Sequence, residues 1–197
     1  MKEIGSHPNV WVMKNRPELT ALAFEEGPKR TKNQYAATSN NWQGGHSDRA
    51  ADILGVACEA YSAFRLGFNP FEITYVFPTA PSGKDADFGG VYEVKRTNSP
   101  QGTLKYRRYT NANHVLIHAY VDRVYNHPEV EAINKVYLMG WNAPKYDGCD
   151  SEHAGYDSRG EEMRSIAYEA RRPMDTIPLL NGAVLLDKPP VLVGEAA

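Results

Sequence analysis

The sequence predicts one domain of the α/β or α+β class, with a mixed central β-sheet flanked by helices. Three observations predict it: an apolar repeat of helical spacing after residue 46, a series of short strand-like segments after it, and 42% hydrophobic residues in a chain of 197. A chain of this length fits a single domain, and that hydrophobic content is enough to build a core. Helix first and strands afterwards is an order typical of these classes.

The expected core covers residues 46–142. An N-terminal extension, 1–45, precedes it, and a C-terminal extension, 143–197, packs on it to complete a single domain. Proline and glycine interrupt the N-terminal extension at Pro8, Pro17, Pro28 and Gly44-Gly45. Only a short helix around 18–25 is therefore expected there, and the rest is expected to be loop.

The core is expected to begin with a helix from Ser47 to Leu66-Gly67. Ser47 or Asp48 can cap the first turn, and Gly67 suits the left-handed conformation that commonly ends a helix. Apolar residues recur between them at helical spacing, namely Ala50, Ile53, Leu54, Ala57, Tyr61 and Phe64.

Five later segments alternate in polarity or are almost continuously apolar, and they are rich in β-branched and aromatic residues. Each therefore predicts a strand. The segments are 71–77, 91–95, 103–109, 114–121 and 134–141. The remaining expectations are a loop at 78–86, loops from 142 to 160, a short helix at 161–171 and an apolar tail from 178 that glycine and proline interrupt.

Charge and cysteine content exclude several classes of function. A net charge of −2 argues against a protein that coats nucleic acid, although residues 95–108 form a local basic stretch without an acid. Cys58 and Cys149 are too few for a disulfide scaffold or a cysteine-rich metal site. No apolar run is long enough to cross a bilayer. A soluble, cytoplasmic protein without membrane partners is expected.

The segment from Asp87 to Lys95 carries the most chemical information. Glu93 and Lys95 are two residues apart on a predicted strand, so their side chains leave the same face, while Tyr92 and Val94 point into a core. Gly89-Gly90 can form a tight turn that brings Asp87 beside Glu93. Two carboxylates and one ammonium group are therefore expected together at one end of the sheet.

This combination of groups suits phosphodiester hydrolysis. Two neighbouring carboxylates repel each other unless a cation lies between them, and Mg²⁺ or Mn²⁺ prefers oxygen ligands. Such an ion can activate water and neutralise a phosphate. Lys95 fits beside it as a group that orients or deprotonates the attacking water. An exposed Glu–Lys pair at a strand edge is the alternative explanation of Glu93 and Lys95.

These residues resemble the PD-(D/E)xK nuclease superfamily. The motif corresponds to Asp87 followed by Glu93-Val94-Lys95, and Ala86 stands where the family name has proline. The resemblance implies a restriction-endonuclease-like core. It also implies that Asp87 and Glu93 bind the metal ion with the carbonyl of Val94.

The helix before the motif extends the resemblance to small phage-type members. Residues 55–68 contain a G-x-x-x-E segment on an alanine-rich helix that ends in Leu-Gly, and Glu59 is the matching acid. The resemblance implies that Glu59 reaches the metal ion, its water or a second ion; a solvent-facing glutamate is the alternative. The resemblance covers roughly 45–142.

Other catalytic arrangements find little support. His114 and His118 are four apart on a predicted strand, which separates them along one face, so a histidine zinc site is not expected. No G-x-S-x-G elbow, Walker loop or dinucleotide-binding glycine motif is present. Arg171-Arg172 could contact a phosphate backbone, although a surface helix end is the commoner explanation.

The sequence therefore predicts a Mg²⁺- or Mn²⁺-dependent endo- or exodeoxyribonuclease of phage or mobile-element type. Nucleic acid, DNA rather than RNA, is the expected partner, and a homodimer would let two sites cut both strands. The expected phosphate contacts are Arg96, Lys105, Arg107 and Arg108. Two alternatives remain: an inactive nuclease fold kept for binding nucleic acid or protein, and a virion accessory or structural protein.

Overall fold

The computed structural model describes residues 10–37, 46–75, 86–107, 113–126, 129–144, 151–156, 160, 162–181 and 184–186. The helices are α1 (Pro17–Ala37) and α2 (His46–Arg65), with short 3-10 turns η2 (Pro70–Glu72), η3 (Tyr168–Ala170) and η4 (Met174–Thr176). The strands are β1 (Trp11–Lys14), β2 (Tyr92–Thr97), β3 (Leu104–Arg107), β4 (Val115–Asn126), β5 (Glu129–Asn142), β6 (Ser151–Tyr156), β7 (Glu162–Ile166), β8 (Leu179–Asn181) and β9 (Val184–Leu186). The predicted α+β class is confirmed.

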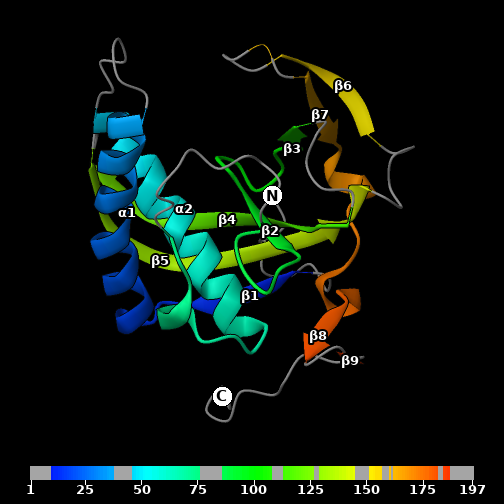
Figure 1. Cartoon of the computed structure of the whole chain (residues 1–197), viewed down its shortest axis with the longest axis horizontal. Helices are drawn as coiled ribbons and strands as arrows, with labels where there is room; N and C mark the ends of the chain where they lie inside the picture. Colours follow the sequence, from blue (N-terminus) through cyan, green and yellow to red (C-terminus); the bar gives the residue numbers. More distant parts are fainter. Residues whose placement is uncertain are drawn as a thin grey trace.

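A four-stranded sheet forms the centre of the molecule, in the order β1-β5-β4-β2 (Figure 1). β2 runs parallel to β4, while β4 pairs with β5 and β5 with β1 in antiparallel fashion. The sheet is therefore mixed, as predicted. β2 is its last strand among the described residues, and no described strand pairs with the other side of β2.

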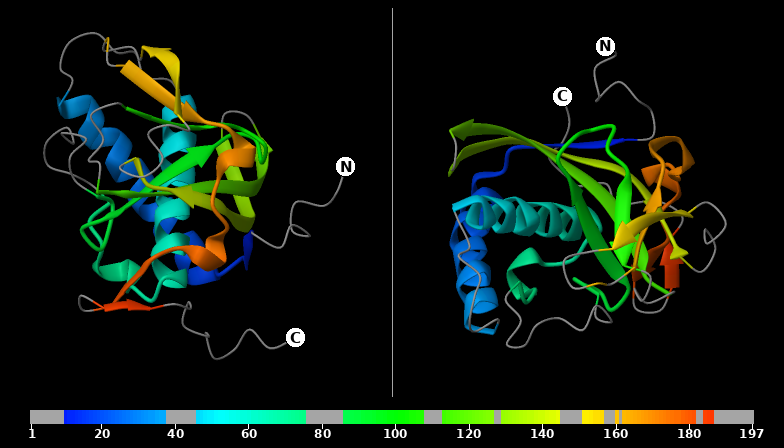
Figure 2. Two further views of the ribbon diagram at one scale, coloured as in Figure 1. Left: turned by 90° about the vertical axis from the view of Figure 1, so that its right-hand side faces the viewer. Right: turned by 90° about the horizontal axis from the view of Figure 1, so that it is seen from above.

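Helix α2 covers one face of this sheet, and α1 packs against α2 (Figure 2). Val115, Ile117 and Ala119 of β4 point toward α2 and join Ala57 and Tyr61 in the largest buried cluster. The alternation along β4 decides this arrangement, because every second residue of a strand faces the same side. Burial of these apolar side chains is the main contribution that holds the helices to the sheet.

A second sheet, in the order β3-β7-β6, packs against the opposite side of β4. Leu116 of β4 lies in a separate cluster with Leu104 and Tyr106 of β3 and Ile166 of β7. Leu116 has the opposite parity to Val115, so β4 supplies both faces of the central layer. β8 and β9 pair with each other as a small hairpin. No described helix is long and apolar enough to cross a membrane.

The helix predicted from Ser47 is confirmed, and Gly67 after it has the expected positive φ of 83°. The short helix predicted around 18–25 is wrong in length, because α1 continues through Pro28 to Ala37. Packing explains this extension: a Cβ on Gly27 would lie 2.6 Å from the Cα of Ile53, so the two helix backbones touch there. That contact stabilises a helix that local propensity alone would end at Gly27-Pro28.

Two predicted elements are wrong in type. Residues 71–75 of the expected strand 71–77 form the end of η2 and an irregular stretch, because the Asn69 side chain accepts a hydrogen bond from the Phe71 N–H at 3.1 Å and starts a turn. The helix expected at 161–171 is instead strand β7 followed by η3, because β7 pairs with both β3 and β6. Tertiary pairing outweighs helical propensity in that segment.

The strands predicted at 91–95, 114–121 and 134–141 are confirmed as β2, β4 and β5, and β4 and β5 both extend beyond the predicted bounds. The described part of 103–109 is β3. β1, β6, β8 and β9 fall where loop or irregular tail was expected, and β1 forms part of the central sheet through β5. The predicted loop 78–86, apart from Ala86, and Cys149 lie outside the described residues.

Candidate active site

Strand β2 places alternate residues on opposite faces of the central sheet. Tyr92 and Val94 are buried in the main core beneath α2. Glu93 and Lys95 therefore lie on the other face, where their register partners on β4 are Leu116 and His118. Glu93 and Lys95 share one face of β2, as predicted.

A tight turn brings Asp87 back beside β2. Gly89 and Gly90 adopt positive φ values of 59° and 71°, and the Asp87 N–H donates to the Tyr92 carbonyl at 2.8 Å. A Cβ on Gly89 would lie only 2.7 Å from the Phe68 ring, so glycine is required there for space as well as conformation. The Asp87 carboxylate then accepts a hydrogen bond from the Val94 N–H at 2.6 Å.

The carboxylate of Glu93 is held at both oxygens. The Lys95 ammonium donates to Oε1, and His114 Nδ1 lies 3.1 Å from Oε2. The side chains of Glu93 and His114 are 8% and 2% exposed, whereas that of Lys95 is 30% exposed. Lys95 is therefore the member of this group that reaches solvent.

Glu59 approaches the same region from helix α2. Its side chain is only 8% exposed and accepts a hydrogen bond from Arg30 of α1 at 2.8 Å. Glu59 is therefore a buried, paired carboxylate and not a solvent-facing residue on the outer surface of the helix.

The electrostatics connect these acids with one another. Burial raises the pKa of Glu59 to about 7, and the charge of Asp87 adds to the shift while Arg30 and Lys95 oppose it. Burial also raises the pKa of Asp87, and the charge of Glu93 raises it further. The charges of Lys95 and Arg30 and the hydrogen bond from the Val94 N–H lower the same pKa, but by less. Asp87 is thus electrostatically coupled to both Glu59 and Glu93.

The acids converge on Asp87 from two sides of the sheet. Glu59 comes from the helical side, Glu93 and Lys95 lie on the opposite face, and Asp87 lies at the free edge of β2 between them. The predicted tight hairpin is therefore present. Asp87 binds the backbone of β2 in addition to any role in the cluster.

The residues expected to contact phosphate are not gathered around Lys95. Arg96 lies on the helical face of β2, where burial lowers its pKa and its Nη1 donates to the Asn98 side chain at 2.6 Å. Lys105 is exposed on β3, Arg107 is half-buried on the same strand, and Arg108 lies outside the described residues. The basic stretch of the sequence is thus distributed over two sheets.

Sequence reasoning missed Arg30 and the pairing of His114. Arg30 lies 29 residues before Glu59, in a segment expected to be loop, and no local motif connects the two. From the sequence, His114 was considered only together with His118, and their spacing on a strand is too wide for both to bind one metal ion. Its buried position just before an apolar strand was the available signal, but its partner Glu93 comes from another strand.

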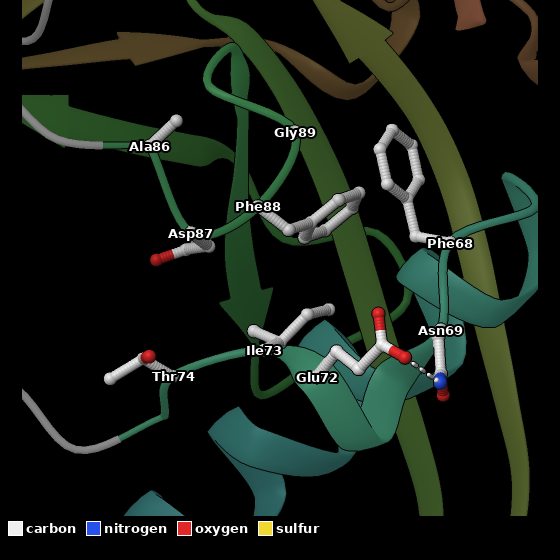
Figure 3. A pocket seen from close by; sticks show the side chains of 9 residues that line it. All are labelled: Phe68, Asn69, Glu72, Ile73, Thr74, Ala86, Asp87, Phe88 and Gly89. Carbon is white, nitrogen blue, oxygen red and sulfur yellow. Dashed lines mark hydrogen bonds between the residues drawn. The ribbon is translucent and has the colours of Figure 1, made fainter.

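A groove of about 390 Å³ opens beside Asp87 (Figure 3). Asp87 and Thr74 lie on one side of it, Phe68, Asn69 and Glu72 on the other, and Ile73 and Phe88 between them. The Asn69 and Glu72 side chains are fixed to each other by a hydrogen bond of 2.8 Å. The groove therefore has apolar walls and a polar rim, and it reaches the acid cluster at Asp87.

The chemistry of the donor set suits a hard divalent ion. The charge of Asp87 raises the pKa of Glu59, and the charge of Glu93 raises the pKa of Asp87, so a cation beside these carboxylates would relieve that repulsion. Within the described part of the chain, however, no group of three or more His, Cys, Asp or Glu side chains is arranged so that it could hold a metal ion. An ion would have to displace existing contacts, such as the Lys95–Glu93 ion pair.

A second buried polar group lies on β4 and β5, on the same face as Lys95. His118 is 1% exposed and stands opposite Gly140, and the Arg171 side chain crosses Gly140. Burial lowers the pKa of His118 to about 3, with a further effect from the charge of Arg171. Among the described residues, His118 Nδ1, Arg171 Nε and Nη1, and Asn142 Oδ1 are buried without a hydrogen-bond partner.

Arg171 lies at the end of the short 3-10 helix η3 and not at the end of the longer helix expected at 161–171. The Arg171 guanidinium lies 4.3 Å from the Tyr168 ring and donates to the Gly102 carbonyl.

Comparisons of the chain with protein-family models, with curated proteins and with solved structures gave no match.

Proposed function

We propose that the protein is a metal-dependent nuclease with a restriction-endonuclease-like core that hydrolyses phosphodiester bonds, in DNA rather than RNA. One observation carries this proposal: the Gly89-Gly90 turn holds the Asp87 carboxylate on the Val94 N–H at 2.6 Å, on the strand that bears the paired side chains of Glu93 and Lys95. Coupled, buried carboxylates beside a lysine are a combination typical of catalytic centres.

Asp87 and Glu93 would hold the ion, with the carbonyl of Val94 as a further oxygen ligand. Mg²⁺ or Mn²⁺ would supply a more acidic water and neutralise the negative charge of the attacked phosphate. His114 keeps the Glu93 carboxylate in place from its buried side, at 3.1 Å. The turn at Gly89-Gly90 fixes Asp87 relative to β2.

Lys95 is the group that would act on the attacking water. Its ammonium is partly exposed and donates to Glu93, so it lies between the buried carboxylates and solvent. Glu59, fixed by Arg30, would accept a hydrogen bond from a water on the helical side of Asp87. Each of these residues then has a single role, which is to orient water, to hold it, or to position the ion.

Substrate would approach along the groove beside Asp87, whose rim is polar and whose walls are apolar. Arg96 on β2, Lys105 and Arg107 on β3, and Arg108 remain the proposed phosphate contacts, although β2 and β3 belong to different sheets. Cutting both strands of a duplex takes two such centres, so we expect a homodimer on double-stranded DNA, acting in the cytoplasm.

One observation favours a second candidate, an inactive nuclease fold that binds nucleic acid or protein. Each acid already has a protein partner: Arg30 for Glu59, the Val94 N–H for Asp87, and Lys95 with His114 for Glu93. Acids that are paired in this way are stable without an ion. Binding without cleavage would then be the activity.

A cleavage assay distinguishes these two functions. Purified protein is incubated with supercoiled plasmid, linear duplex and single-stranded DNA, and with RNA, in Mg²⁺, Mn²⁺ or EDTA. We expect cutting with either ion and none in EDTA, and a loss of about 100-fold or more in Lys95→Ala, the range for removal of a positioned proton-transfer group. Lys135→Ala, a change of an exposed lysine on β5, is the matched control and should cut normally.

Equal cutting by Lys95→Ala and wild-type protein would indicate a contaminating nuclease and reject the assignment. Nucleic-acid binding in a gel-shift experiment, with no cutting under any condition, would favour the inactive binding protein.

A further inference from the structure

Arg30 is held against helix α2 by the packing of the two helices. A Cβ on Gly55, one turn before Glu59, would lie 3.4 Å from Arg30 Nη1, so the guanidinium crosses α2 at the glycine. α1 and α2 meet backbone to backbone at Gly27 (Figure 2), and the Thr31 hydroxyl donates to Asp52 at 2.6 Å. Arg30 is therefore a fixed cation and not a mobile surface side chain.

This cation interacts with more than its direct partner. Burial lowers the pKa of Arg30, but the charges of Glu59, Asp87 and Asp52 raise it by more, so the net shift is upward. The Arg30 side chain is only 16% exposed. Little solvent lies around the guanidinium to screen its field, which therefore extends from Glu59 to Asp87.

The charges of the cluster decide how many divalent ions it can hold. When all three acids are ionised, Glu59, Asp87 and Glu93 carry three negative charges, and Arg30 and Lys95 carry two positive charges, which leaves one negative charge. One divalent ion together with one phosphodiester group brings this sum to zero. Two ions would leave two uncompensated positive charges in a largely buried site, which is costly.

We propose that Arg30 occupies the place of a second cation beside Glu59 and thereby limits the centre to one divalent ion. This inference rests on the proposed metal-dependent nuclease. It selects one of the two roles open to Glu59: Glu59 holds water through its fixed carboxylate and does not bind a second ion. Arg30 is then a positioning residue, because it acts through Glu59.

Removing the charge of Arg30 should open a second ion site. Arg30→Met leaves Glu59 buried without its cation, and Glu59 and Asp87 then form a carboxylate pair of the kind that binds a hard ion. Arg30→Gln removes the charge but keeps a donor facing Glu59, so it tests the same point in a variant that retains the hydrogen bond.

The experiment counts Mn²⁺ ions bound per chain, by calorimetry and by the electron paramagnetic resonance signal of free Mn²⁺. We expect one ion for the wild-type protein and two for Arg30→Met and Arg30→Gln. The second ion should bind at least about tenfold more tightly to these variants than to the wild type, which corresponds to about 1.4 kcal/mol. Circular dichroism melting, with and without Mn²⁺, checks that each variant is folded.

Lys29→Met is the matched control. Lys29 is the preceding residue of α1, carries the same charge and pairs with Glu25 and Glu26 at the surface, so its loss should leave the count at one. Two ions in the wild type, or one ion in a folded Arg30→Gln, would overturn the inference and leave the nuclease proposal standing. No ion bound by the wild type would overturn both.

Discussion

Two buried histidines, one just before β4 and one within it, lie in opposite environments. His114 is 3.1 Å from the Glu93 carboxylate, whereas His118, four residues later, lies beside the cation Arg171 and has no hydrogen-bond partner at Nδ1. The first belongs to a group in which each acid is paired, and the second to a group in which several polar atoms are unpaired. The comparison shows that the polar group around His114 stabilises the fold, whereas the polar group around His118 destabilises it.

The largest expected effect tests the close packing around His118. Gly140→Ala should lower the free energy of unfolding by about 3 kcal/mol, because φ is +144° and the new Cβ would lie 2.8 Å from the Arg172 carbonyl oxygen. Gly155→Ala is the control: φ is +90°, but the space is open, so only about 1 kcal/mol of strain is expected. Urea denaturation measures both. Equal losses would mean that the Arg171-Arg172 segment does not pack on Gly140.

The next effect compares the two histidines directly. His114→Phe leaves a buried oxygen of Glu93 without its partner, and we expect a loss of about 2 kcal/mol in unfolding free energy. His118→Phe removes an atom that has no partner, and the change should stay within about 0.5 kcal/mol. The same substitution at both positions controls for ring size. Equal losses in urea denaturation would remove the distinction between the two groups.

The smallest net effect is in the pH dependence of the wild-type protein's stability. The pKa of His118 falls from 6.5 to about 3 on folding, so the unfolded chain binds this proton first and stability decreases as pH falls below 6.5. The pKa of Glu59 rises from 4.5 to about 7, so the folded chain binds that proton first and stability increases as pH falls below 7. Between pH 6.5 and 4.5 the two contributions oppose each other.

Single variants should separate these contributions. Glu59→Gln should become less stable than the wild type as pH falls from 6.5 to 4.5, and His118→Phe more stable, by at most about 1.4 kcal/mol per pH unit for one proton. Urea denaturation at four pH values across this range gives the slopes. Parallel slopes in the two variants would show that neither group titrates as described.

Local patterns were sufficient where one element determines its own shape. The helix that begins near Ser47 and the alternation of Tyr92, Glu93, Val94 and Lys95 needed only spacing and turn residues. The common face of Glu93 and Lys95 followed directly from the strand, and the Gly89-Gly90 turn followed from the lack of a side chain.

Patterns failed where a distant partner decides the outcome. β7 contains good helix formers but pairs with β3 and β6, and Trp11–Lys14 becomes a strand only through β5. Arg30 could not be assigned to the site, because its position depends on how α1 crosses α2 at Gly27. The side of the sheet from which Glu59 approaches likewise depends on packing and not on the motif.

The hydrogen bond between Asp87 and the Val94 N–H also protects an open sheet edge. β2 is the last strand of its sheet, and an unpaired edge can recruit a strand from another molecule. Asp87→Ala would therefore remove a charge and also free a backbone donor for association between chains. Asp87→Asn keeps an acceptor for that donor. Self-association of the alanine variant alone would show that this aspartate keeps the protein from aggregating, independently of any chemistry it performs.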